Sequence, residues 1–421
     1  MLRFARNDRR GPPSLALLSA VTALAFCGLH MVVPALPLLV LVFNDSAAHV
    51  QLVLSLYLAG IAVGQLFYGP ASDRFGRRPV LLAGLAMFLV GTVLCGFAWS
   101  LPALIAGRIL QALGACAGIV LSRAIIRDVY EREAAARGLA LVMMVMTLAP
   151  AISPAFGAYL AEWFDWRAIF ALLGGLGGIV FIITVIRLPE TNRHRVRLNV
   201  VGMAAAYFEL LHSPSFVGFA LCSACTSASW FTFIASAPHI LADGLQQSPS
   251  TYGLMILLPM ATYMLGNAVA ARFATRLGSL RLLLYGRTLA FIAAIGLASW
   301  GASAGLGVWA LFVPIALAEI GDGMSQPAVM AAALSIQPRL AGTASGLMGF
   351  LQMATAAIGS FIVALLPYDS ALGLTAVFGG FVALALGSGI FAVSRVSRDS
   401  EALVVGAAAP VADGNWREES A

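Results

Sequence analysis

The chain has 421 residues, of which 60% are hydrophobic and only 10% are charged, and it carries a formal net charge of +6. A soluble domain carries about 25% charged residues, so this composition leaves too few charges to cover a surface that faces water. It excludes a soluble enzyme and predicts an all-α membrane protein with lipid around most of its exterior.

Twelve long apolar segments follow one another along the chain, each close to the length of about 20 residues that a helix needs to cross a bilayer. The runs are continuously apolar without strict alternation, which favours helices over a β-barrel. The first run follows four arginines, as in a signal peptide, but its length and its prolines, Pro34 and Pro37, favour a retained helix. The predicted segments are 14–41, 50–71, 79–98, 102–124, 137–161, 168–188, 215–238, 252–274, 280–300, 306–333, 341–366 and 371–393.

The basic residues are all arginines, and they gather on one side of the predicted membrane. With the N-terminus in the cytoplasm, nearly all fall on the inner side; only Arg167 falls in an outside loop, and Arg108 lies within a helix. This assignment counts Arg287 with the inside loop between the eighth and ninth segments. The positive-inside rule therefore predicts that both termini are cytoplasmic, and it explains the net charge without a nucleic-acid partner.

The longest interior polar stretch divides the chain into two halves of six helices. The sequence Arg74-Phe75-Gly76 of the first half has a counterpart, Arg276-Leu277-Gly278, in the second, which indicates an internal duplication. The chain end is polar and acidic, so we expect it to be disordered. The expected organisation is a cytoplasmic N-terminus at 1–13, six-helix bundles at 14–188 and 215–393, a cytoplasmic linker at 189–214 and a cytoplasmic tail at 394–421.

The loop after the second segment reads GPASDRFGRRPV from Gly69. It resembles the loop signature of the major facilitator superfamily, and the resemblance extends from residue 14 to about residue 395. Other runs resemble one subfamily, the Bcr/CflA drug-resistance antiporters, which include chloramphenicol and florfenicol exporters. These runs are Leu56-Tyr57-Leu58 to Gly64-Gln65, Arg108-x2-Gln111-x2-Gly114, Arg123 to Asp128, Trp166 to Phe170, Leu188-Pro189-Glu190-Thr191 and Gly342 to Gly346.

The resemblance implies twelve helices in two halves around a central cavity, acting as a monomer by alternating access in a bacterial inner membrane. It implies a small-molecule substrate, a proton gradient as energy source and no cofactor. Two departures stand out. His30 lies where the subfamily has a first-helix aspartate, and the fifth-helix exporter motif retains only Pro154 and Gly157.

The loop at Gly69 is a candidate gate. Its glycines permit a tight turn, and Asp73 can lie near a helix N-terminus or pair with arginine. In relatives this loop locks the cytoplasmic side, and the resemblance implies that Asp128 completes the charge network with Arg77. The alternative is ordinary positive-inside charge on a turn. The predicted gating residues are Gly69, Asp73, Arg74, Gly76, Arg77, Arg78 and Asp128.

Four ionisable residues lie well inside predicted helices: His30, Arg108, Glu319 and Asp322. A charge at mid-depth costs about 2.5–3.5 kcal/mol, so it usually serves a cavity or a partner. Glu319 and Asp322 are three residues apart and share a helix face. Repulsion and desolvation both favour a shared proton, so we expect one of them to be the coupling acid, with His30 as a secondary group and Arg108 as a partner. The alternatives are a structural polar pair at a helix bend and an arginine bound to backbone carbonyls.

The sequence also suggests which side chains line a substrate cavity, although packing or lipid contact is an equal alternative for any one aromatic residue. The candidates are Met31, Gln111, Trp230, Phe233, Tyr263 and Gln326. Cys222 and Cys225 form a lone CxxC without further ligands nearby, so we expect no metal site.

Three functions remain open at this level. The favoured one is a proton-coupled exporter of small amphiphilic drugs, and the second is a metabolite exporter or importer of the same architecture. The third, a membrane-embedded enzyme or receptor, is disfavoured because no HExxH, GxSxG or P-loop motif occurs and no segment is long enough for a soluble domain.

Overall fold

The computed structural model describes residues 13–192, 200–303, 307–366 and 371–407. Within them, twelve helices are long and apolar enough to cross a membrane, which confirms the predicted number of spans. The expected N-terminal segment 1–13, except Pro13, lies outside the described residues, as do residues 193–199 of the linker and 408–421 of the tail.

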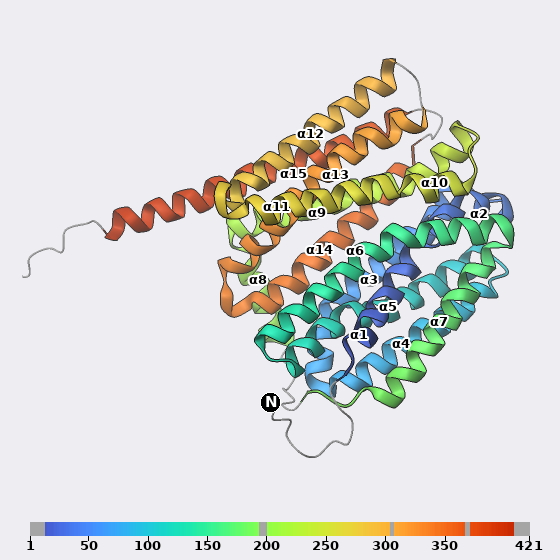
Figure 1. The fold of residues 1–421 in the computed structure, drawn as a ribbon, viewed down its shortest axis with the longest axis horizontal. Helices are drawn as coiled ribbons and strands as arrows, with labels where there is room; N and C mark the ends of the chain where they lie inside the picture. The colour runs from blue at the N-terminus through green and yellow to red at the C-terminus, as the bar shows by residue number, and fades with distance from the viewer. Residues whose placement is uncertain (1–12, 193–199, 304–306, 367–370, 408–421) are drawn as a thin grey trace, which may run out of the picture.

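Helices account for nearly all of the described chain (Figure 1). The first half comprises α1 (Leu15–His30), the short η1 (Val33–Ala35), α2 (Leu36–Phe43), α3 (Ala47–Phe75), α4 (Arg77–Gly96), α5 (Leu101–Val129), α6 (Arg132–Trp163) and α7 (Trp166–Arg187). The second comprises α9 (Pro214–His239), η2 (Ile240–Gly244), α10 (Pro249–Met255), α11 (Leu257–Leu277), α12 (Ser279–Ser303), α13 (Val308–Ile336), η3 (Pro338–Leu340), α14 (Ala341–Ala364) and α15 (Ala371–Ala407).

The first span is broken into α1, η1 and α2. Pro34 lies inside η1, where its missing N–H and fixed φ interrupt the α-helical hydrogen bonds. The single helix expected over 14–41 is therefore two helices joined by a turn.

Close glycine contacts pack the helices of each half in the same way. A Cβ atom on Gly84 of α4 would touch Ala117 and the carbonyl of Gly114 on α5. A Cβ atom on Gly286 of α12 would touch the carbonyl of Gly321 on α13. Small residues let membrane helices approach backbone to backbone, because lipid provides no hydrophobic force that drives helices together. The matching contacts in the two halves agree with the duplication inferred from sequence.

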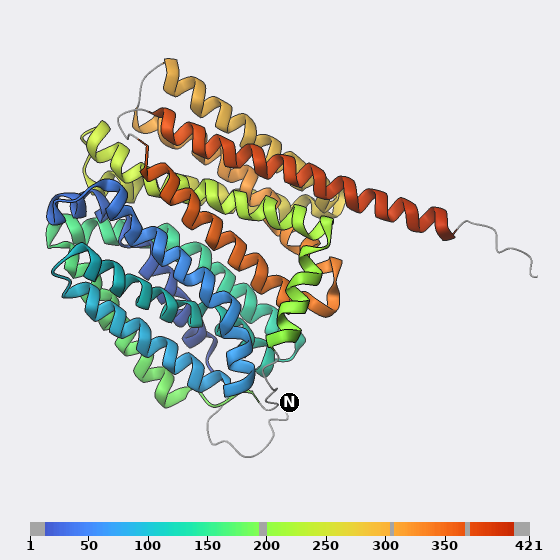
Figure 2. The same ribbon diagram turned by 180° about the vertical axis from the view of Figure 1, so that it is seen from behind.

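The halves lie side by side, and they meet mainly where α3 packs against α14 and α6 against α10 (Figures 1 and 2). These cross-half contacts are the ones that any rocking of one half against the other must change.

Both connecting segments contain helical structure. The linker 189–214 contains a helix, α8 (Val200–Leu211), which packs against α14 and α9. The tail begins as helix, since α15 continues to Ala407 and extends beyond the bundle (Figure 2). The expected disorder of 394–421 is therefore wrong for its first part.

Candidate functional site

The predicted gating loop is a sharp glycine turn between two spans. α3 ends at Phe75, Gly76 follows with φ = 105° and ψ = 151°, and α4 begins at Arg77. Only glycine adopts this backbone conformation readily. Gly278, at the corresponding turn of the second half, has φ = 84°. The two turns are thus alike in backbone as well as in sequence.

Arg77 is the centre of the charge network at this turn. Its guanidinium contacts Asp73 at 2.6 Å and Asp128, at the end of α5, at 2.8 Å. Its backbone N–H donates to Oε1 of Glu190 at 2.8 Å. The contact between Arg77 and Asp128 that the resemblance implies is therefore present, and the network joins α3, α4, α5 and the segment after α7.

Glu190 is a member of this network that the sequence did not single out for a role. Its Oε1 also accepts the N–H groups of Thr191 and Asn192, and the Asn192 side chain donates to the carbonyls of Ser72 and Asp73. The signal was the run Leu188-Pro189-Glu190-Thr191, which was noted only as part of the resemblance.

The remaining gating candidates lie at the edge of the network. Arg78 donates to the carbonyl of Val185, and the guanidinium of Arg74 lies 5.0 Å from the ring of Phe75. Gly69 has open space where a Cβ would be, so a glycine there is not sterically required.

Arg287 does not lie where the sequence predicted it. It is buried within α12, with 2% of its surface exposed, and does not lie in an inside loop. Nη2 contacts Oδ1 of Asp322 at 2.5 Å, and the guanidinium also donates to the hydroxyls of Thr226 and Ser325. One arginine thus binds side chains of α9 and α13. The sequence already indicated that Arg287 lies within the membrane, because the span predicted at 280–300 contains this position.

Glu319 lies one helical turn before Asp322 on α13, and it is also buried, with 4% of its surface exposed. Within the described part of the chain, its carboxylate makes no hydrogen bond or ion pair. A buried carboxyl without a partner is favoured in its neutral, protonated form, whereas one paired with arginine is favoured in its ionised form.

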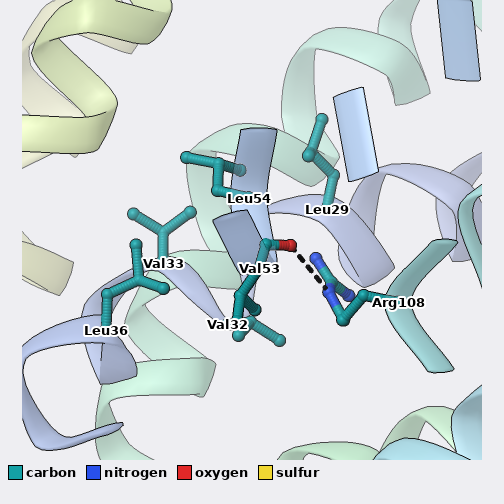
Figure 3. Close-up of a pocket in the computed structure, with 7 residues that line it drawn as sticks. All are labelled: Leu29, Val32, Val33, Leu36, Val53, Leu54 and Arg108. Carbon is teal, nitrogen blue, oxygen red and sulfur yellow. Dashed lines mark hydrogen bonds between the residues drawn. The ribbon is translucent and has the colours of Figure 1, made fainter. Parts of the chain in front are cut away.

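Arg108 does not meet the acids of α13. It donates to the carbonyl of Val53 at 3.4 Å (Figure 3). It also donates to the carbonyl of Gly28 at 2.7 Å and to Oε1 of Gln111 at 2.6 Å, and it lies 3.9 Å from the centroid of the Tyr57 ring. The side chain is fully buried. These contacts match the alternative of an arginine held by backbone carbonyls.

A narrow apolar recess adjoins Arg108, and it leaves no room for a water molecule (Figure 3). Its other lining residues are Leu29, Val32, Val33, Leu36, Val53 and Leu54.

The contacts of His30 likewise do not include Glu319 or Asp322. Its Nδ1 bonds the carbonyl of Phe26 at 3.0 Å, and its ring lies 6.1 Å from that of Phe231 on α9. The pairing of His30 and Arg108 with the α13 acids, which the sequence suggested, is not formed; Arg287 takes that position.

The candidate cavity residues divide between the halves. Gln111 is engaged with Arg108 and Thr92. Trp230 packs against Phe233, and Phe233 against Phe312 of α13. Met31 is buried, and its carbonyl lies where a Cβ atom of Gly157 would be. The carbonyl of Tyr263 lies against Gly323, and Gln326 accepts a hydrogen bond from Ser223.

The retained fifth-helix residues lie at a tight contact between spans. Pro154 and Gly157 are on the buried side of α6, where Gly157 meets the backbone of Met31. On the same helix, Ala155 lies against Gly253 of α10 in the other half. Any side chain at position 157 would push the first span away from α6.

The described residues contain no group of three or more metal-ligating side chains. Cys222 and Cys225 are both buried and unpaired by disulfide.

Side-chain contacts cross the seam between the halves at several levels, and one of them places Gln65 of α3 against Gly349 of α14. Ser55 of α3 and Ser360 of α14 share a hydrogen bond of 2.8 Å, and His30 meets Phe231. Figure 1 places α2 and α10 together at the end of the bundle away from Gly76. The halves are therefore in contact along α3 and α14 as well as between α6 and α10.

Twelve spans in two like halves are matched by the family model described as the Major Facilitator Superfamily, over residues 18–360 and 219–417. The chain belongs to the major facilitator superfamily. It is therefore a multi-pass membrane transporter and not an enzyme.

Named relatives cover most of the chain. A chloramphenicol resistance protein of Pseudomonas aeruginosa is 33% identical over 85% of this chain and 85% of its own length. Multidrug resistance protein D of Escherichia coli is 30% identical over 86% and 91%. A bicyclomycin resistance protein homolog of Haemophilus influenzae is 27% identical over 87% and 93%. These names describe the relatives.

Solved structures share the fold. The human organic anion transporter MFSD10 superposes with a TM-score of 0.68 at 18% identity, covering 90% of this chain and 98% of its own. The transporter PepTSo superposes with a TM-score of 0.69 at 15% identity, covering 93% and 99%.

Proposed function

We propose that this transporter exports small amphiphilic drugs in exchange for protons, by alternating access, from the cytoplasm of a bacterial cell through the inner membrane. Relatives named for resistance to chloramphenicol and to multiple drugs support export as the direction. The arginine distribution supports cytoplasmic termini, which puts the turn at Gly76 on the cytoplasmic side. In this proposal the chain works as a monomer without a cofactor.

The observation that carries the proton coupling is the arrangement of two buried acids around one arginine. Asp322 is bound by Arg287, whereas Glu319, one turn away, has no partner among the described residues. Because Arg287 stabilises the charge of Asp322 and no such partner among these residues faces Glu319, Glu319 is the acid that binds and releases the transported proton. Arg287, and neither Arg108 nor His30, is the basic partner of this site.

The gating network supports alternating access. Arg77, with Asp73, Asp128 and Glu190, holds the cytoplasmic ends of several N-half helices as one unit. The contacts of Ser55 with Ser360 and of His30 with Phe231 join the two halves further from Gly76. Access to the substrate path changes from one side of the membrane to the other when the contacts between the halves break. The N-half then moves as one body, because the Arg77 network holds its helices together.

The test uses inside-out membrane vesicles with an acidic interior. Addition of chloramphenicol is expected to release protons and dissipate the pH gradient with the native chain. Glu319→Gln is expected to abolish this response, because a permanently neutral side chain cannot release a proton. The matched control is Glu162→Gln, which neutralises an exposed acid near the end of α6 and is expected to leave the response unchanged.

Two outcomes would contradict the proposal. If the native chain dissipates no gradient with any of a panel of antibiotics, proton-driven drug export is wrong. If Glu319→Gln retains the native response, the assignment of the proton to Glu319 is wrong, and Asp322→Asn becomes the next variant to measure.

A further inference from the structure

Three uncharged polar side chains from three helices meet in the middle of the C-terminal half. Nε2 of Gln352 on α14 donates to Oγ of Ser223 on α9 at 2.6 Å, and that hydroxyl donates to Oε1 of Gln326 on α13 at 3.0 Å. Each residue lies at least nine positions from either end of its span, which is about 13 Å of helix. We call these three residues the amide cluster.

The hydrogen-bond chain within the amide cluster leaves specific groups unused. An amide side chain offers two donors and one carbonyl oxygen. Gln352 uses a donor and Gln326 uses its oxygen, so the NH₂ of Gln326 and the carbonyl oxygen of Gln352 have no partner within the described residues. Both residues are partly exposed, whereas Ser223 is buried. The cluster thus presents a donor and an acceptor together.

The exposed side of the amide cluster faces the seam between the halves and not the lipid. Gly349 and Ser360 mark the side of α14 that meets α3, because their neighbours there are Gln65 and Ser55. Thr355 marks the side that meets α9, since it donates to the carbonyl of Ala224. At 3.6 residues per turn, Gln352 falls between these two sides. Free amide groups at this depth need a polar partner, because hydrocarbon offers none.

An aromatic surface lies two helical turns from the amide cluster on the same face of α9. Trp230 is seven residues after Ser223, about 10 Å further along the helix axis. It is partly exposed, and it is held by Phe233. The side chains of Trp230 and of the amide cluster both extend from their helices into the space between, so one drug-sized molecule could contact both.

From these positions we propose that the amide cluster is a binding subsite for the hydroxyl or amide group of an uncharged amphiphile whose aromatic part packs on Trp230. This inference rests on the proposed function only in treating the seam as the substrate path. A group that both donates and accepts matches the free NH₂ of Gln326 and the free oxygen of Gln352. A lipophilic cation without donors or acceptors satisfies neither of them.

The test measures equilibrium binding to the purified full-length protein in lipid nanodiscs, so it does not depend on transport. The two probes are chloramphenicol, an uncharged aromatic molecule with hydroxyl and amide groups, and tetraphenylphosphonium, which has neither. Gln326→Leu and Gln352→Leu are each expected to weaken chloramphenicol binding about threefold to tenfold, which corresponds to one lost hydrogen bond. Tetraphenylphosphonium binding is expected to stay unchanged.

The control is Gln51→Leu, which removes a fully buried amide of α3 without a hydrogen-bond partner among the described residues, outside the subsite. Unchanged chloramphenicol binding in both cluster variants would overturn the proposal, as would an equal loss of both probes, which indicates a structural role. If a leucine variant does not fold, Gln326→Met, with an unbranched side chain of similar length, gives the same comparison. Selective loss of chloramphenicol binding without proton-driven export would sustain the subsite and refute the proposed function.

Discussion

Replacement of Arg287 by glutamine is expected to destabilise the protein strongly, because it leaves Asp322 as a buried charge without a counter-charge. The two side chains are 2% and 7% exposed, so water screens their attraction little. Charge centres about 4 Å apart attract by about 4 kcal/mol at an effective dielectric constant of about 20. This figure agrees with the cost of about 3–5 kcal/mol for removal of one partner of a buried pair.

The double variant Arg287→Gln/Asp322→Asn is the informative comparison. It removes both charges together, so no unpaired ion is left, and replacement of a whole buried pair is often nearly neutral for stability. The double variant is therefore expected to recover most of the stability that Arg287→Gln loses. Arg287→Lys is expected to lie between them, because an ammonium keeps the charge but cannot hold Asp322, Thr226 and Ser325 with one planar fork.

Equilibrium unfolding of the purified variants in mixed micelles measures these differences. Arg272→Gln, which changes an exposed arginine of α11, is the control and is expected to shift the free energy of unfolding by less than about 0.5 kcal/mol. The reasoning is refuted if Arg287→Gln is as stable as the native chain, or if the double variant is no more stable than Arg287→Gln.

Three further predictions concern the gate and the topology. Asp73→Asn is expected to impair efflux strongly while the protein remains in the membrane, because it weakens the hold on Arg77; normal efflux at normal abundance would contradict this. Gly76→Ala is expected to cost about 1–3 kcal/mol from its backbone conformation and more from collision with Glu190. Gly278→Ala, with a similar φ and open space, is expected to cost only the first part, so equal losses of unfolding free energy would exclude a role for Glu190. Reporter fusions are expected to place the loops after Leu101, Asp165 and Asp369 outside and those after Arg78 and Arg195 inside.

The sequence alone determined the membrane architecture, because hydropathy is a local property. A run of about 20 apolar residues crosses the bilayer whatever its neighbours do, so the number of spans could be counted along the chain. The turn at Gly76 could also be predicted, since glycine spacing and charge are written within a few adjacent positions. The contact of Asp128 with Arg77 was accessible through the resemblance, which carries tertiary information from related chains.

Contacts between residues far apart in the chain were determined only by the tertiary structure. Glu190 reaches Arg77 across 113 positions, and the run Leu188-Pro189-Glu190-Thr191 by itself does not show which residue the acid contacts. Counting arginines by loop assigned Arg287 to the cytoplasm, because the rule considers charge near a span end and not what α9 and α13 place beside it. Arg108 was expected near the acids, but the carbonyls of Gly28 and Val53 take its donors, since α1 and α3 pack against α5. Which acid keeps a partner and which stands alone depends on helix packing, and this packing separates Glu319 from Asp322, which share one helix face.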